Sequence, residues 1–369
     1  MSASLPAAEI VIACHTPERN VQDAVASVLD HNENVAARVV AHNVDPGELW
    51  AVIDPRHHDG VVMDELRDGL RSPSGPFSHG IDTGRSEWFG ILGSDDVLEP
   101  GAVDSWRRLA LRTRAQYVIP RLRREERRFP TPTPPVRAHQ LARILAGAAP
   151  DLDPIRDRLV FRSAPLGLIE REFFTGFEHR LEPGLNVGGD VHLTTQLMLH
   201  ARTAFDATGP AYLVRDSASD RTTLVIRPLS QQFGFFETTF AHLSSDTERH
   251  AVALKFLRIH IFSALVVRSR PEHWSTAQRE ELARWTQFLL GQSRRVRADL
   301  SVAEERLVQQ CLAPYTPHED LLAASRARGR HASVSAVLPS HPLRLLAPQG
   351  SLRTVAGSAL NMLVPRRRR

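Results

Sequence analysis

Short apolar runs alternate with helix-like repeats through the first half of the chain. Residues 9–13 form a mostly apolar run typical of a buried strand, and Val21, Val25 and Val28 then recur at helical spacing. Strands that alternate with helices favour a mainly parallel sheet covered by helices on both faces, so we predict a three-layer α/β fold. The other expected strands are residues 38–41, 60–63, 88–92, 116–120 and 211–215, and the other expected helices are residues 75–85, 101–114, 138–145 and 191–199.

The pattern changes near residue 229, where amphipathic helices replace the strands. These helices are expected at residues 233–240, 251–267 and 276–290. An arginine- and proline-rich segment, 121–135, interrupts the first half and is either a solvated excursion or a flexible loop near the active site. We therefore predict an α/β domain over residues 1–225, an α-helical module over 226–325 and a flexible basic tail over 326–369.

Composition narrows the classes of protein that the chain can represent. It has 369 residues, of which 42% are hydrophobic, and this is enough for a large buried core. The net charge is +4, but residues 341–369 carry +6 and the rest of the chain −2, and only 6% of the residues are aromatic, so we expect no nucleic-acid partner. Lys255 is the only lysine among 46 basic residues, which indicates a bias in composition rather than a binding specialisation.

The sequence carries no sign of secretion or of a membrane span. Its first residues lack a basic segment followed by an apolar core, and we expect no membrane-spanning run of about 18 apolar residues. Cys14 and Cys311 are too far apart in sequence for a disulfide framework, so a cytoplasmic location fits best. Leucines precede Arg366–Arg369 at the end of the tail. Disorder is favoured there, and peripheral contact with the inner face of the membrane is the alternative.

The strand expected at residues 88–92 leads directly into two adjacent acids, Asp95 and Asp96. Active sites of α/β proteins lie at strand ends. Carboxylate oxygens bind Mg²⁺ or Mn²⁺, and such an ion can carry a diphosphate on its open positions. The alternative is a loop that caps the helix beginning near Gly101.

Three other segments carry candidate chemistry, and they are spread along the α/β domain. The first is the opening strand and its helix, residues 10–29; the second is the segment 74–82; and the third comprises 163–169 and 188–193. With residues 93–96, they resemble family 2 of the inverting glycosyltransferases, which have the GT-A fold. The resemblance covers about residues 8 to 225.

The resemblance implies roles for the acidic residues. Asp95 matches the retained metal-binding carboxylate of an Asp-x-Asp motif, and Asp96 would help to hold the divalent cation, Mg²⁺ or Mn²⁺. Asp190 matches the aspartate of a Glu-Asp motif and would accept the proton of the acceptor hydroxyl. Its alternative is an ordinary helix cap. This chain departs from the family at both motifs, because Gly93 and Gly189 stand where the family has acids.

The resemblance also implies a nucleotide pocket. Ala13 and His15 belong to the loop that would contact the nucleotide, and Ser94 lies beside the metal motif. Asn43 could hydrogen-bond a uracil edge and Asp45 could reach the ribose or the base, although either is equally a turn residue. Asp68 is a further candidate for this pocket.

The function implied is sugar transfer with inversion from a nucleotide-diphosphate sugar to a hydroxyl of a glycan or glycolipid. A UDP-sugar is the expected donor. Cell-envelope or exopolysaccharide synthesis is the expected setting. One alternative is a non-catalytic nucleotide- or glycan-binding protein on a degenerate GT-A fold. Another is a nucleotidyltransferase, which would need a basic phosphate-binding loop near the first strand, where the chain offers only Arg19.

Overall fold

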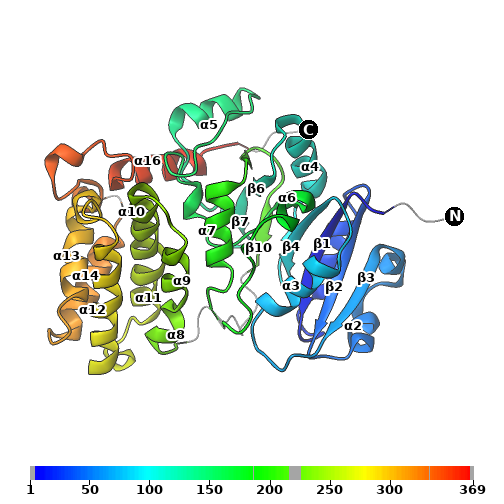
Figure 1. The fold of residues 1–369 in the computed structure, drawn as a ribbon, viewed down its shortest axis with the longest axis horizontal. Helices are drawn as coiled ribbons and strands as arrows, with labels where there is room; N and C mark the ends of the chain where they lie inside the picture. The colour runs from blue at the N-terminus through cyan, green and yellow to red at the C-terminus, as the bar shows by residue number, and fades with distance from the viewer. Residues whose placement is uncertain (1–4, 186, 216–225, 332, 366–369) are drawn as a thin grey trace.

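The computed structural model describes residues 5–185, 187–215, 226–331 and 333–365, and it has an α/β half and an α-helical half (Figure 1). The α/β half is built on a seven-stranded sheet in the order β3-β2-β1-β4-β8-β6-β9. Its strands are β1 (Ala8–Cys14), β2 (Val35–His42), β3 (Val61–Leu66), β4 (Trp88–Gly93), β6 (Tyr117–Pro120), β8 (Leu168–Glu170) and β9 (Thr203–Asp206). The pairs β1–β2, β2–β3, β1–β4 and β6–β9 are parallel, whereas β8 pairs antiparallel with β4 and β6.

Side chains alternate across the sheet and build a core on each face. Ile10 and Ile12 of β1 belong to the core that includes Val25 and Trp106, whereas Val11 belongs to the opposite core with Leu197. This arrangement gives the three predicted layers. The helices of the α/β half are α1 (Val21–Leu29), α2 (Pro46–Val52), α3 (Ser74–Thr83), α4 (Ala102–Thr113), α5 (Ala138–Leu145), α6 (Arg171–Thr175) and α7 (Val191–His200).

A small second sheet in the order β5-β10-β7 uses part of the segment 121–135. Its strands are β5 (Val97–Leu98), β7 (Leu122–Arg124) and β10 (Tyr212–Val214). Arg123 of β7 pairs with Glu99, Nη1 to Oε1, at 2.5 Å. The first residues of this segment are therefore part of a sheet, and the prediction of a solvated excursion was wrong for them.

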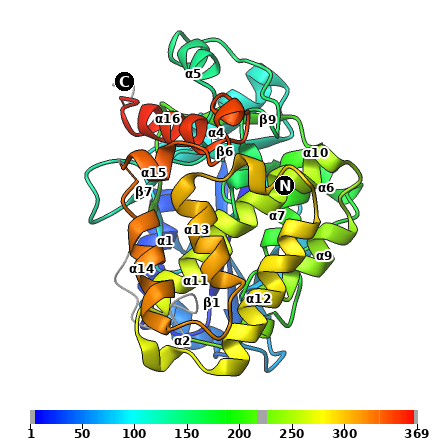
Figure 2. The same cartoon turned by 90° about the vertical axis from the view of Figure 1, so that its left-hand side faces the viewer.

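From residue 226 onward, the regular elements of the described residues are helices, and Figure 2 shows several of them. They are α8 (Leu229–Phe233), α9 (Phe235–Ala241), α10 (Asp246–Lys255), a π-helical turn (Phe256–Ile261), α11 (Phe262–Val267), α12 (Thr276–Gly291), α13 (Val302–Cys311), α14 (His318–Arg328), α15 (Val334–Val337) and α16 (Ser351–Met362). The continuous helix Asp246–Val267 is long and apolar enough to cross a membrane, but 72% of its most apolar window is buried inside the protein. It packs as the core helix of this half. The predicted boundary at residue 225 lies outside the described residues.

The structure corrects the prediction of a flexible tail over residues 326–369 where it describes them: α14 extends to Arg328, and α15 and α16 lie within residues 333–365. Helix α16 packs beside α5, a contact that both views show (Figures 1 and 2). Buried arginines bind the carbonyls that precede it: Arg158 Nη2 donates to Pro348 O at 2.8 Å, and Arg258 Nη1 donates to Gln349 O at 2.8 Å. Prolines and glycines of the tail lie at or near the ends of short helices, so their presence does not mean that the tail is disordered. Arg366–Arg369 lie outside the described residues.

Candidate functional site

The site is built on the carboxyl ends of the parallel strands β1, β2 and β4, which the sheet register aligns. Ala13 lies opposite Gly93, and Cys14 lies opposite Ala41. The next residues along the chain are the exposed His15 and the buried Ser94. The structure therefore brings three of the predicted nucleotide-binding residues, Ala13, His15 and Ser94, to one edge of the sheet.

The two acids after β4 have different surroundings. Both oxygens of Asp96 accept hydrogen bonds from the protein: Oδ2 from the Tyr212 hydroxyl at 2.8 Å and Oδ1 from the backbone N–H of Arg215 at 3.0 Å. Tyr212 also accepts a hydrogen bond from the backbone N–H of Gly93 at 3.1 Å. Asp96 thus holds β10 against the end of β4, which is a structural role that the sequence did not indicate.

Asp95 keeps the more available carboxylate, with 15% of its side chain exposed. Its Oδ1 lies 3.5 Å from Arg19 Nη1, which comes from the loop after β1. A carboxylate beside the aligned strand ends is a suitable oxygen ligand for Mg²⁺ or Mn²⁺. The donor set is small, because the protein oxygens of Asp96 are already engaged, so a cation here would rely on diphosphate oxygens for its other ligands. The residues fit a cation that binds together with a nucleotide.

The predicted base-reading residues form a hydrogen-bonded group at the ends of β2 and β3. Asn43 Nδ2 donates to Asp68 Oδ1 at 3.3 Å and to Leu70 O at 3.0 Å, and Asp68 Oδ1 lies 2.8 Å from His42 Nε2. Burial alone would raise the pKa of Asp68, but its hydrogen bonds with His42 and the Leu70 N–H outweigh this and lower it. Asn43 has a positive φ of 57°, as in a turn. The pair Asn43–Asp68 is thus held in one orientation.

Asp45 has the local role that the sequence left open. It is the N-cap of α2, and its Oδ1 accepts a hydrogen bond from the Gly47 N–H at 2.7 Å. The structure therefore places Asp45 as a helix cap beside the Asn43–Asp68 pair.

Asp190 is positioned directly before α7 but does not cap it. Its backbone is right-handed helical, with φ −98° and ψ −16°, and its side chain makes no capping hydrogen bond. Desolvation raises the pKa of Asp190 to about 6, and its own N–H and the charge of Lys255 oppose only part of this rise. The carboxylate therefore remains available to accept a proton from a ligand.

Lys255 lies behind Asp190, and sequence reasoning missed it. The side chain is fully buried, and Nζ donates to Arg162 O at 2.7 Å and to Thr195 Oγ1 of α7 at 3.3 Å. Burial lowers the pKa of Lys255 to about 7, opposed by the charge of Asp190. The π-helical turn begins at the next residue, and such turns are frequent at functional sites. The signal in the sequence was a lone lysine in an apolar helix of an arginine-rich chain.

The start of α3 connects the Asn43–Asp68 pair with Asp190. A Cβ atom on Gly75 would lie 2.7 Å from Asp68 Oδ2, and one on Gly189 would overlap Ser74 Oγ and lie 2.7 Å from Glu182 O. Ser74 and Gly75 are neighbours in the first turn of α3. The same turn therefore contacts Asp68 on one side and the residue before Asp190 on the other.

This close packing also accounts for the absent glutamate at position 189. A side chain there would displace the start of α3 or the Glu182 backbone. At Gly93, a Cβ atom would lie 3.0 Å from Asp96 Oδ2 and 3.1 Å from Asp95 Oδ1. A side chain would fit there if these two carboxylates moved by a few tenths of an ångström. Backbone and the start of α3 therefore exclude a side chain at position 189, whereas only movable side chains crowd position 93.

The fold is of the GT-A type, and comparison with solved structures confirms the predicted α/β class. S. aureus TarS 1–349 in complex with UDP-GlcNAc superposes with a TM-score of 0.69 at 11% sequence identity, over 88% of this chain and 91% of that chain. The same TarS fragment in complex with UDP gives 0.64 at 11% identity, over 89% and 92%.

A further crystal structure of S. aureus TarS gives a TM-score of 0.64 at 10% identity, and the match covers 87% of this chain but 55% of that chain. The likeness therefore extends beyond the α/β half into the helical half of this chain. Sequence comparisons add no family: no family model matches, and no curated protein matches.

Proposed function

We propose that the protein transfers a sugar from a nucleotide-diphosphate sugar to a hydroxyl of a glycan or glycolipid acceptor, with inversion. The observation that carries the proposal is Asp190, a desolvated carboxylate that stands at a helix start without capping it. The likeness to TarS over 88% of the chain supports it, because TarS was crystallised in complex with UDP-GlcNAc. A UDP-sugar is accordingly the proposed donor.

In this mechanism Asp190 is the general base. Its carboxylate takes the proton from the acceptor hydroxyl while the oxygen attacks the anomeric carbon from the face opposite the leaving diphosphate. Attack from the opposite face gives inversion. Lys255 would hold α7, and with it Asp190, through its hydrogen bonds to Thr195 and Arg162. Lys255 is therefore a positioning residue rather than one that contacts the substrate.

At the other side of the site, Asp95 would hold the divalent cation, Mg²⁺ or Mn²⁺, through its carboxylate. When bound, such a cation stabilises the charge that develops on the leaving diphosphate. Arg19, 3.5 Å from Asp95, would add a second positive charge at the same place. Ala13, His15 and Ser94 line this strand edge, and the Asn43–Asp68 pair would contact the uracil and ribose.

One alternative keeps the fold and the nucleotide but not the reaction. Gly93 and Gly189 stand where the resembled family has acids, and the packing around Gly189 leaves no space for a glutamate. A non-catalytic nucleotide- or glycan-binding protein on a degenerate GT-A fold would show such losses. Because Asp190 and Asp95 are both present, we favour the transferase.

The proposed setting is cell-envelope or exopolysaccharide synthesis at the inner face of the membrane. Several tail leucines are exposed, among them Leu343 at 89% and Leu363 at 70%. Leucines next to basic residues favour contact with an anionic membrane surface. Sedimentation with anionic vesicles tests this contact, and a chain with Leu343 and Leu363 changed to Ser should sediment less than the wild type.

Calorimetric titration tests the proposed donor. UDP should bind, more tightly with Mn²⁺ than without it, and GDP should bind more weakly. Incubation with UDP-GlcNAc and other UDP-sugars should then release UDP slowly to water and faster with an acceptor. Binding without any turnover would favour the non-catalytic alternative. No binding of either nucleotide, with or without Mn²⁺, would contradict both.

A further inference from the structure

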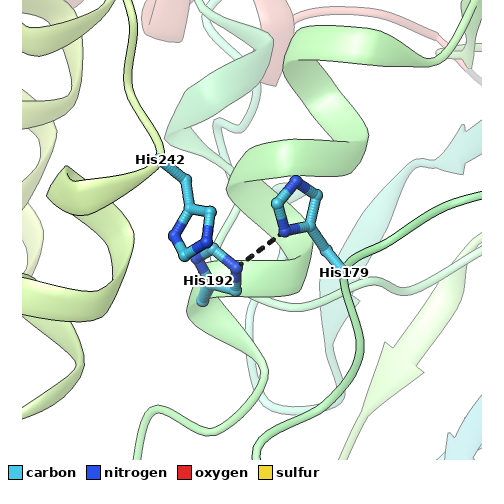
Figure 3. Close-up of side chains that lie close together, drawn as sticks. All are labelled: His179, His192 and His242. Carbon is cyan, nitrogen blue, oxygen red and sulfur yellow. Dashed lines mark hydrogen bonds between the residues drawn. The ribbon is translucent and has the colours of Figure 1, made fainter.

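Three histidines from separate segments converge beside the start of α7 (Figure 3). His179 lies in the loop after α6, His192 in the first turn of α7, and His242 directly after α9. One ring nitrogen of each lies within 4.8 Å of those of the other two. Among the described residues this is the one group of three or more His, Cys, Asp or Glu side chains with such spacing.

The spacing of the nitrogens fits a tetrahedral metal ion. Nε2 of His192 and Nδ1 of His179 are 3.1 Å apart. A Zn–N bond of about 2.0–2.1 Å places two ligand nitrogens of a tetrahedron about 3.4 Å apart. The third nitrogen, on His242, lies within 4.8 Å of the other two and would have to move closer to them, and the exposed position of His242 leaves its ring room to rotate.

The histidines are also prepared as ligands. His242 Nδ1 lies 2.9 Å from Thr238 O, so this nitrogen carries the proton and Nε2 keeps its lone pair. Such a hydrogen bond from the outer ring nitrogen to a carbonyl is usual for metal-binding histidines. Nε2 of His192 and Nδ1 of His179 form a hydrogen bond with each other, so one proton lies between them and a metal ion would replace it.

The surroundings contain an acid with one unsatisfied oxygen. Glu182 lies near enough to His242 for its charge to matter, and its Oε1 is buried with no hydrogen-bond partner among the described residues. His192 is 5% exposed, and within the same described residues its Nδ1 also has no partner. A bound cation would compensate the acid directly or through a water molecule.

We propose that His179, His192 and His242 bind one divalent transition-metal ion of the zinc class, with an open fourth position. Three imidazoles favour Zn²⁺ over Mg²⁺ or Mn²⁺, which prefer oxygen ligands, so this site differs in chemistry from Asp95. The ion would tie the loop after α6 and the start of α7 to the end of α9. Because His192 lies two residues after Asp190, the ion would also fix the start of the helix that carries the proposed base.

The test uses full-length protein without a histidine tag, freed of metal by a chelator. Titration with Zn²⁺ should show one tight equivalent, and Co²⁺ should give the intense visible absorption of a tetrahedral site. Zn²⁺ should also raise the Tm. His242→Ala and His179→Ala should each weaken Zn²⁺ binding by about 100-fold or more and abolish the tetrahedral Co²⁺ spectrum. His31→Ala, at an exposed histidine elsewhere, is the matched control and should bind as the wild type does.

The proposal is overturned if metal-free protein takes up no tight equivalent of Zn²⁺, or if His242→Ala and His179→Ala retain wild-type affinity. His242 is exposed, so its replacement leaves the fold intact, and the Tm of the metal-free variant checks this directly. The readouts are metal affinity and the Co²⁺ spectrum, so the result is independent of whether the protein proves to be a sugar transferase.

Discussion

At the residue scale, acids that look alike in the sequence have different hydrogen-bond partners in the structure. Asp95 and Asp96 are neighbours, yet Asp96 binds Tyr212 and the Arg215 backbone while Asp95 faces Arg19. Likewise Asp45 caps a helix and Asp190 does not. The partners of each acid come from residues far away in the chain. Hydrogen-bond partners, rather than residue type, therefore decide which acid is available to a ligand.

The first prediction concerns these two acids. Asp95→Asn should weaken UDP binding in the presence of Mn²⁺ by about 10-fold, because an amide is a weaker ligand for a hard cation, and should leave the Tm unchanged. Asp96→Asn should instead lower the Tm, because an amide cannot accept both hydrogen bonds. Calorimetry and thermal unfolding of the two variants check this. If Asp96→Asn instead weakened UDP binding and Asp95→Asn lowered the Tm, Asp96 would be the cation ligand and Asp95 the structural residue.

The second prediction concerns Lys255. Lys255→Met removes the charge behind Asp190 and the hydrogen bonds to Arg162 and Thr195, which are worth roughly 1.5–3 kcal/mol each to a charged donor. We expect kcat to fall by about 10-fold or more, with KM for the UDP-sugar unchanged. Thr195→Val removes only one acceptor and should have a smaller effect. If kcat and KM of Lys255→Met equal those of the wild type, Lys255 is only part of the core.

The sequence predicts candidate residues that follow a local pattern, but not those whose partners lie on distant segments. Acids at a strand end or a helix start are visible as patterns, so Asp95 and Asp190 could be proposed. The proposed roles of Lys255 and the histidines became apparent only from the fold, because their partners lie on other segments. His179, His192 and His242 are 63 positions apart from first to last, and nothing in their spacing along the chain indicates a shared site.

At the scale of elements, the start of α3 links the Asn43–Asp68 pair to Asp190. Most strands and helices of the α/β half lie where hydrophobic periodicity predicts them, from β1 to α7. The short strands β5, β7, β8 and β9 and the short helices α2 and α6 were not predicted, because so few residues carry little periodicity. The pairing of β5 and β7 also depends on β10. The tail helices were missed because their stability comes from buried arginines of other elements.

The third prediction tests the packing of α3. Gly189→Ala should destabilise the protein by about 1–3 kcal/mol, because a Cβ atom there overlaps Ser74 Oγ and the Glu182 backbone. Gly176→Ala is the matched control: its Cβ atom would meet nothing nearer than Phe173 O at 3.8 Å. Denaturant unfolding of both variants measures the difference. Equal stability would mean that the approach of α3 to Gly189 is looser than described.

At the scale of the whole molecule, one buried ion pair joins the core helix to the C-terminal segment. Arg258 of the π-helical turn binds Glu304 of α13 through two nitrogens, Nε at 2.9 Å and Nη2 at 3.0 Å, and also binds Gln349 O. The helical half and the chain end therefore depend on the same guanidinium. This long-range connection is one of the contacts that hold the tail against the rest of the protein.

The fourth prediction follows from Glu304. Burial would raise its pKa, but Arg258 outweighs this and lowers it from the ordinary value of 4.5 to about 2. A lowered pKa in the folded state stabilises the protein above pH 4.5, and this contribution is lost as the pH falls from 4.5 towards 2. The shift corresponds to about 3 kcal/mol.

Denaturant unfolding between pH 7 and pH 3 measures this contribution. Glu304→Gln should be less stable at pH 7, because it leaves Arg258 buried without its counter-charge, and its stability should fall less steeply with acid. If the free energy of unfolding of the wild type and that of the variant depend on pH in the same way, Arg258 does not stabilise the ionised form of Glu304 as described.

The central claim is that Asp190 is the base of a sugar transferase, and the Asp190→Asn variant tests it most directly. UDP affinity and UDP-sugar turnover should be measured on the same preparations of wild type and variant. The variant should keep UDP affinity nearly intact and lose turnover by about 10²–10⁴-fold, because an amide cannot accept the proton. A variant that turns over the UDP-sugar at the wild-type rate would contradict the assignment.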